Sequence, residues 1–256
     1  WIRSPDAVPA YAEVEAMYRQ KGYKNANDVV KFQAEASAIE KSDPTLRREF
    51  SGDPAAEPLS RGNKLLNIMG GWRWSFGNQS ITWQFDVPED GLYKMGLHIG
   101  HWYNDGLPSY RQLAIDGKVP FEELLEYKFS YQMQGYQLET LSDSDENPYL
   151  FYLDKGEHTL TMTVKMGPMA SLLERMTDDI LLLGHIIRQI QMITSSEPDP
   201  NYDYELHKRI PDLLDNFQIF SDSMQVLVDE TLLISEKVPS MARNFATIKD
   251  QLRAMI

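Results

Sequence analysis

The segment HWYNDGLPSY, residues 101–110, contains side chains whose types and spacing suit the binding of a ligand. Trp102 and Tyr103 are adjacent, so a strand could not turn both rings into one core. Asn104 and Asp105 follow directly and supply hydrogen-bonding groups. A sugar requires this combination, because its C–H face stacks on an aromatic ring while its hydroxyls bind fixed polar groups. Ordinary packing within a loop is the alternative.

A second aromatic stretch, GGWRWSFGNQSITW, covers residues 70–83. Strand-like alternation would place Trp72 and Trp74 on one face, and it predicts that Trp83 lies in a core. Aromatic side chains bury large areas, so packing in a core or at a sheet edge is the alternative to ligand binding for this stretch. We include Trp72, together with Tyr110 at the end of the first loop, among the candidate ligand contacts.

The elements that must position these residues are mostly strands. Alternation runs from Val29 to Val164, and short apolar runs are separated by turn signals such as Asp116-Gly117 and Lys155-Gly156. This pattern favours an antiparallel β-sandwich of jelly-roll, galactose-binding-like type over residues 28–168. Residues 1–27 hold a short helical pattern with few apolar positions, and we predict a linker helix there.

After Pro168 the apolar spacing becomes helical. Pro211 begins a second long helical pattern, and a third follows Pro239. Residues 169–256 are therefore predicted to form an antiparallel helical bundle, which makes the chain α+β overall. The stripe predicted to face the bundle core is Met169, Leu172, Leu173, Met176, Ile180, Leu183, Ile187 and Ile190.

Composition excludes several classes of partner. The 256 residues include 38 acidic and 25 basic side chains, a formal net charge of −13, which repels phosphate backbones, so we expect no nucleic-acid partner. The chain has no cysteine and therefore no disulfides. No apolar run approaches the roughly 20 residues of a membrane span. The chain begins abruptly at Trp1 and stops within a helical pattern at Ile256, so we expect it to be part of something longer.

Sequence motifs for catalysis are missing. No nucleophile elbow, phosphate-binding loop or zinc-binding helix motif occurs. Glu122 and Glu123 are adjacent and would point apart, whereas two catalytic carboxylates must flank one bond. We therefore expect a protein that is not an enzyme.

Four segments together resemble a known family: FQAEA, SITWQFDVPEDGLYKMGLHI, RQLAIDGKVPFEEL and PYLFYLDKGEHTLTMTV. They are similar to carbohydrate-binding-module-like domains of families six and thirty-five. The resemblance is closer to such domains in large extracellular solute-binding proteins of sugar ABC transporters from Gram-positive bacteria. IIRQIQMITSSEPDPNYDYELHKRIPDLL resembles a helical insertion in those proteins.

The resemblance implies a sandwich interrupted by helices before its final strand. It also implies an extracellular protein, attached to the cell surface through parts outside this chain. The function expected is that of a non-catalytic carbohydrate-binding or accessory module of a solute-binding lipoprotein, whose partners are an oligo- or polysaccharide and other domains of that lipoprotein. The alternative is a cell-surface scaffold for protein interactions that binds no sugar.

The resemblance also implies a structural calcium, which the sugar modules often bind through a Glu-Ala-Glu strand. The matching residues here are Gln33, Ala34 and Glu35. Glu35 fits, whereas Gln33 offers a neutral amide oxygen where the family has a carboxylate, which weakens affinity for a hard cation. Gln33 and Glu35 are thus weak candidates for metal ligands, and no other cofactor is expected.

Overall fold

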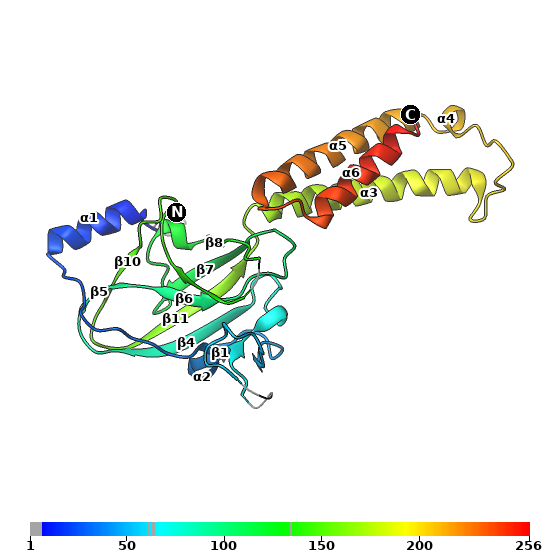
Figure 1. Ribbon diagram of the computed structural model, residues 1–256. Helices are drawn as coiled ribbons and strands as arrows, with labels where there is room; N and C mark the ends of the chain where they lie inside the picture. Colours follow the sequence, from blue (N-terminus) through cyan, green and yellow to red (C-terminus); the bar gives the residue numbers. More distant parts are fainter. Residues whose placement is uncertain (1–6, 61, 63–64, 134) are drawn as a thin grey trace. The chain divides into compact units, whose positions relative to one another are not determined.

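The computed structural model describes residues 7–60, 62, 65–133 and 135–256 (Figure 1). The chain divides into two compact units. The β unit comprises Trp1–Asn104 and Pro108–Gly167, and the helical unit comprises Asp105–Leu107 and Pro168–Ile256. Three residues of the 101–110 loop thus belong to the helical unit.

The strands of the β unit pair antiparallel throughout the named sheets, as predicted. One sheet has five strands in the order β1-β4-β11-β7-β8, and the two-stranded sheets are β10-β5, β2-β3 and β6-β9. The jelly-roll and galactose-binding-like assignments stay predictions. The strands are β1 (Ala38–Lys41), β2 (Arg48–Glu49), β3 (Ile68–Met69), β4 (Ser80–Val87), β5 (Gly91–Lys94), β6 (Gly96–Ile99), β7 (Ser109–Ile115), β8 (Tyr127–Phe129), β9 (Gln137–Thr140), β10 (Leu150–Leu153) and β11 (Gly156–Lys165).

Strand β4 shows how the sequence pattern builds the sheet. Ile81, Trp83 and Val87 are buried, which confirms the face predicted from alternation. On the opposite face, the Thr82 and Thr161 hydroxyl oxygens lie 3.0 Å apart across β4 and β11. β4 is therefore a central strand with one apolar and one polar face.

One core joins the five-stranded sheet to the smaller sheets. Leu113 of β7 and Leu160 of β11 belong to the same buried cluster as Leu92 of β5 and Phe151 of β10. Phe121 is also fully buried there, next to the 3₁₀ turn η2 (Glu122–Leu124). The β unit is thus sandwich-like, since apolar faces of separate sheets meet in one core.

Two strand predictions need correction. The alternating run at 29–36 is not a strand: it leads into a short helix, α2 (Ala34–Ser37), and Val29 is almost fully exposed. The turn signal at Lys155-Gly156 predicts that the runs on either side of it pair as a hairpin, but β10 pairs with β5, while β11 pairs with β4 and β7. Alternation reports which residues are buried, but it does not report which strand will be the partner.

The first helix is not a linker, contrary to our prediction. Helix α1 (Tyr11–Lys21) ends at Gly22, whose φ of 69° suits the predicted left-handed stop. Its Val14 and Tyr18 are buried in the core of the β unit. The ring of Tyr11 contacts the rings of Phe121 and Tyr149 edge-on, at 4.8 and 4.6 Å between centroids. A few apolar residues are enough to anchor α1 in the core of the β unit, because their side chains are large. Residues 1–6 lie outside the described part of the chain.

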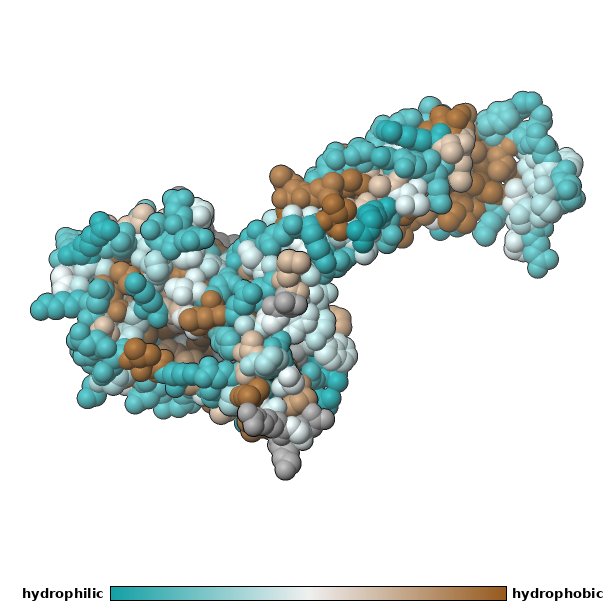
Figure 2. Space-filling model, viewed as in Figure 1, coloured by the Kyte–Doolittle hydropathy of each residue, from teal (hydrophilic) through white to brown (hydrophobic). Residues whose placement is uncertain are grey.

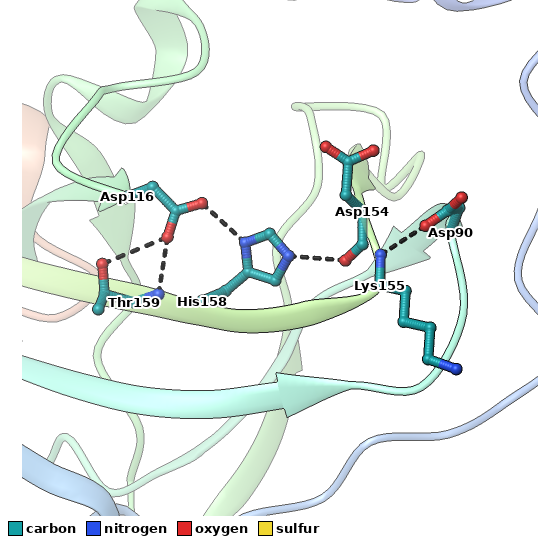
Figure 3. Close-up of polar contacts among 6 residues, drawn as sticks. All are labelled: Asp90, Asp116, Asp154, Lys155, His158 and Thr159. Atoms are coloured by element: carbon teal, nitrogen blue, oxygen red, sulfur yellow. Dashed lines mark hydrogen bonds and ion pairs between the residues drawn. The ribbon is translucent and has the colours of Figure 1, made fainter.

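A histidine at the start of β11 connects two turns of the β unit (Figure 3). His158 Nδ1 lies 2.7 Å from Asp116 Oδ2, and His158 Nε2 lies 2.7 Å from the carbonyl oxygen of Asp154. Asp116 also accepts a hydrogen bond of 2.8 Å from the backbone N–H of Thr159. Only the protonated imidazole can donate from both nitrogens. The two contacts therefore favour the protonated, imidazolium form of His158.

We expect the β unit to lose stability as pH rises from about 6.5, the unfolded pKa of histidine, through the raised folded pKa of His158. Burial alone would lower the pKa of His158, but the hydrogen bonds to Asp154 and Asp116 outweigh it and raise that pKa. A raised pKa stabilises the folded state below the unfolded value of about 6.5, and the contribution disappears as pH rises through the folded value. Melting temperatures of the native chain and of the His158→Gln variant, measured across this pH range, test the prediction. Parallel curves for the two proteins would contradict it.

The helical unit consists of α3 (Met169–Thr194), α4 (Leu206–Arg209), α5 (Leu213–Ile234) and α6 (Ser240–Arg253), as predicted in type. Leu172, Met224 and Phe245 pack together in its core. The predicted core stripe of α3 is wrong at three positions, because the side chains of Leu173, Ile180 and Ile187 are exposed. No helix among the described residues is both long and apolar enough to cross a membrane.

Candidate functional site

The two adjacent rings of the 101–110 loop lie differently. Tyr103 is 71% exposed, whereas Trp102 is half-buried. Their centroids are 5.4 Å apart and their planes differ by 32°. The rings therefore form a slightly bent pair with one member open to solvent, which is the arrangement that a stacked ligand needs.

The position of Trp102 is fixed by two neighbours that sequence reasoning missed. The Trp102 ring lies against Gly100 so closely that a Cβ atom there would collide with it. The ring of Tyr136 meets Trp102 edge-on at 5.2 Å and 90°. Gly100 directly follows a predicted strand. A glycine at such a position is a detectable signal that a neighbouring ring approaches the backbone closely, since glycine leaves room for it.

Reciprocal hydrogen bonds hold the same loop to the segment after β8. The backbone N–H of His101 donates to Gln132 Oε1 at 3.1 Å, and the backbone N–H of Gln132 donates to the carbonyl of His101 at 2.7 Å. Gln132 is buried. A buried amide with satisfied partners makes a loop rigid, so the aromatic pair stands on a fixed base.

Tyr136 connects this base to the loop before β3. Burial raises the pKa of Tyr136, the nearby charges of Tyr103 and Asp53 also raise it, and a hydrogen bond with Ser51 acts in the opposite direction. The loop is shaped by buried Asn67, which accepts from the Ser51 N–H at 2.8 Å and donates to the Ser51 carbonyl at 3.1 Å. A single asparagine in an irregular segment has no periodic pattern, so the sequence carried no signal for it.

Trp72 lies on the short 3₁₀ turn η1 (Gly71–Arg73), not on a strand as alternation predicted. Trp72 is 61% exposed, and the Arg73 guanidinium lies over its ring, 4.4 Å from the centroid. Arg73 Nε also forms an ion pair of 2.6 Å with Glu49 Oε1. Trp74 turns inward instead and meets the Trp83 ring edge-on at 5.9 Å.

These contacts bring four loops of the β unit together: residues 47–57, 70–74, 100–104 and 130–136, of which residue 134 is not described. We call the surface of these neighbouring loops the four-loop surface. Arg73 and Glu49 join the first two loops, and Trp102 and Tyr136 join the last two. The surface combines ring faces with carboxylate, guanidinium and amide groups, which can stack on a planar or ring-shaped ligand and bind its hydroxyls.

Two predicted site residues are held in contacts within the fold. Tyr110 is buried on β7, and its ring lies so close to Gly167 that a Cβ atom there would collide with it. Asp105 belongs to the helical unit, where its carboxylate accepts from the Ser240 backbone N–H at 2.6 Å and pairs with Lys237 at 3.2 Å. The bond from Ser240, with Lys237 beside it, lowers the pKa of Asp105 to about 2. Asp105 thus stabilises the beginning of α6.

Asn104 stays within the β unit and is exposed. Its side-chain nitrogen donates to the carbonyl of Pro108 at 3.4 Å, a long hydrogen bond that a ligand can replace. The predicted contacts Trp72, Trp102, Tyr103 and Asn104 therefore all reach the surface at least in part, and their role in binding stays a prediction.

The calcium prediction gains no support from the arrangement of side chains. Glu35 is buried and Gln33 is half-buried, on either side of Ala34, whose carbonyl accepts a hydrogen bond of 2.8 Å from the Trp83 indole. Among the described residues, no group of three or more histidine, aspartate or glutamate side chains could hold a metal ion. The acidic neighbours that a calcium at Glu35 would need are therefore not assembled.

No protein-family model matches the chain, and no curated protein matches it. Among solved structures, a cycloisomaltooligosaccharide glucanotransferase from Paenibacillus sp. is similar at 17% identity and a TM-score of 0.36, over 62% of this chain and 21% of that one. A family 35 carbohydrate-binding module from Clostridium thermocellum is similar at 12% identity and a TM-score of 0.36, over 55% and 88% of the two chains. Another family 35 module, from an environmental isolate, has 9% identity and a TM-score of 0.32, over 56% and 80%. Similarities of this size establish neither family nor function.

Proposed function

We propose that the β unit is a carbohydrate-binding module whose ligand stacks on Tyr103 and Trp102 at the four-loop surface. The observation that carries this proposal is the exposed Tyr103 ring beside a Trp102 ring held in place by Gly100 and Tyr136. A ring fixed before the ligand arrives loses little conformational entropy on binding. Nearby Asn104 supplies an amide for sugar hydroxyls.

The setting proposed for this module is a solute-binding lipoprotein of a sugar ABC transporter, outside the cell of a Gram-positive bacterium. The support is the resemblance of the strand segments and of the helical segment in the sequence. The jelly-roll, galactose-binding-like topology belongs to the same proposal. The chain would reach the cell surface through parts outside it.

The module is proposed to be non-catalytic. His158 and Asp116 form a close histidine–carboxylate pair that could suggest a general base. Both ring nitrogens of His158 are already bound within the fold, to Asp116 and to the Asp154 carbonyl. No nitrogen is left to accept a proton from a substrate, so this pair supports a structural role.

A protein-interaction scaffold is the second candidate function, and a specific observation favours it. Large apolar side chains are exposed on the helical unit, including Ile180, Leu181 and Leu233. Figure 2 shows hydrophobic surface along the helices of this unit. Exposed apolar patches of this kind commonly bind other proteins. This second function would place binding on the helices and leave the four-loop surface without a ligand.

A glycan array incubated with the whole 256-residue chain separates the two functions. The proposal predicts that a subset of neutral or acidic glycans retains the protein, and that an excess of the same free glycan releases it. An array on which no glycan retains the folded chain would overturn the proposal in favour of the scaffold.

A further inference from the structure

Helix α3 carries a regular row of exposed apolar side chains. Leu173, Ile180 and Ile187 are 40, 66 and 43% exposed, and they follow one another at intervals of seven residues. Residues seven apart lie on nearly the same face of an α-helix, so the three side chains form one straight row. The row lies beside the buried positions of the same helix, such as Leu172 and Ile186.

Small residues alternate with the large ones along this row. Thr177 and Gly184 lie four residues after Leu173 and Ile180, on the same face. The Thr177 hydroxyl donates to the Leu173 carbonyl at 2.8 Å, so its polar group is already satisfied within the helix. Large side chains at one step and small ones at the next form the knobs and holes of a helix–helix seam.

The residues along one edge of the row have complementary charges. Glu174, Leu181 and Arg188 are again seven apart, with the acidic residue at one end and the basic residue at the other. Neither Glu174 nor Arg188 forms an ion pair with another residue in the described part of the chain. Leu181 between them is 67% exposed. When two copies of this edge run in opposite directions, Glu174 of each copy lies opposite Arg188 of the other.

We propose that α3 is a self-association surface on which a second copy of this chain packs its own α3 in the antiparallel direction. In such a pair, Glu174 of each copy meets Arg188 of the other, and the two Leu181 side chains meet on the two-fold axis. Ile180 of each copy packs over Gly184 of the other, after the flexible Arg188 side chain, whose guanidinium lies beside Gly184, turns toward Glu174 of the other copy. A parallel pair would place Glu174 level with Glu174 and is disfavoured.

The second exposed row of the helical unit explains why α3 rather than α5 is the surface. Ile219, Val226 and Leu233 on α5 are also exposed and seven apart. Asp222 and Asp229 lie along one edge of that row, and no basic residue lies at the matching positions of α5. A second copy of α5 would meet like charges in either direction, which opposes self-pairing.

The interface involves one helix from each copy and is therefore at the small end of the range for specific interfaces. We expect the 256-residue chain to be a monomer at low concentration and a dimer at high concentration, with a dissociation constant on the order of 10 µM. Sedimentation velocity over about 1 to 500 µM would follow the transition.

Charge exchange tests the antiparallel pairing. Glu174→Arg alone places a new guanidinium against Arg188 of the other copy, and Arg188→Glu alone places two glutamates together, so each single variant should weaken dimerisation at least tenfold. Mixing the two single variants should give a heterodimer, because an arginine then faces a glutamate at both ends of the pair and the repulsion within each homodimer is relieved. The double variant should dimerise like the native chain. Both substituted positions are exposed, so the fold is retained.

Cross-linking tests the two-fold axis independently. The chain has no cysteine, so Leu181→Cys introduces its only thiol. A short bismaleimide should link two Leu181→Cys chains efficiently, and should link two Ile219→Cys chains, altered on α5, only weakly. A native chain that stays monomeric up to the highest concentration would overturn the proposal. Single charge variants that dimerise like the native chain, or equal cross-linking at both positions, would also overturn it.

Discussion

Replacing Trp83 with alanine is expected to lower the free energy of unfolding of the β unit by about 3–5 kcal/mol. The Trp83 ring is only 4% exposed, meets the Trp74 ring edge-on, and donates its indole N–H to the Ala34 carbonyl at 2.8 Å. The substitution would leave a cavity between sheets and an unpaired carbonyl, and both effects destabilise. Chemical denaturation monitored by circular dichroism measures the loss.

The matched control for this variant is Trp72→Ala, which removes the same ring from an exposed position. Its contact is the Arg73 guanidinium over the ring face, and exposed contacts of that kind contribute about 0.5–1 kcal/mol. A loss for Trp83→Ala no larger than for Trp72→Ala would contradict the placement of Trp83 in the core.

Trp102→Ala is expected to abolish measurable glycan binding and also to reduce the stability of the β unit. Truncating one stacking ring removes about 1–3 kcal/mol of binding free energy, which weakens a modest affinity about 5- to 150-fold, to below the range that a titration detects. The half-buried ring also supports Tyr136 and fills the space against Gly100, so its loss should lower the free energy of unfolding by about 1–2 kcal/mol. Calorimetric titration and thermal melting measure the two effects separately.

The control for this variant is Trp102→Phe, which keeps a ring in the same place. It should recover most of the stability and part of the affinity. If Trp102→Ala kept the native affinity for the glycan, the ring would have a structural role only.

Local patterning predicted the parts of the fold that depend on neighbouring residues. The alternation of Ile81, Trp83 and Val87 identified β4 and its buried face correctly, because a strand with one apolar face has only one stable orientation in a sandwich. The left-handed stop at Gly22 was likewise predicted from one residue type.

Two predictions that rested on apolar periodicity alone were wrong. Alternation at Trp72 and Trp74 implied a strand, but Gly70 and Gly71 have positive φ values of 83° and 53°, and the chain forms a 3₁₀ turn instead. The apolar pattern of α3 implied a fully buried stripe, yet Ile180 is exposed because the helices packed on α3 do not reach that side. Periodicity describes one element and carries no information on what covers it.

In the candidate site too, the residues predicted from their neighbours in the sequence differ from those that distant segments supply. Trp102, Tyr103 and Asn104 were predicted from adjacent aromatic and polar residue types, and all three reach the surface at least in part. The side chains that hold them, Tyr136 and Gln132, come from a segment some 30 residues away, and single-sequence reasoning has no means of pairing segments that far apart.

Tyr103→Ala provides the most direct test of carbohydrate binding at the four-loop surface. The Tyr103 ring is exposed, so its removal changes the ligand surface without opening the core. The matched control is Tyr202→Ala, which removes another exposed tyrosine ring, from the helical unit. Titration of each variant with the glycan that the array selects, together with its melting temperature, gives the result. We predict that Tyr103→Ala weakens binding at least tenfold at an unchanged melting temperature, while Tyr202→Ala binds like the native chain. Native affinity in Tyr103→Ala, or equal losses in both variants, would contradict a carbohydrate site at this surface.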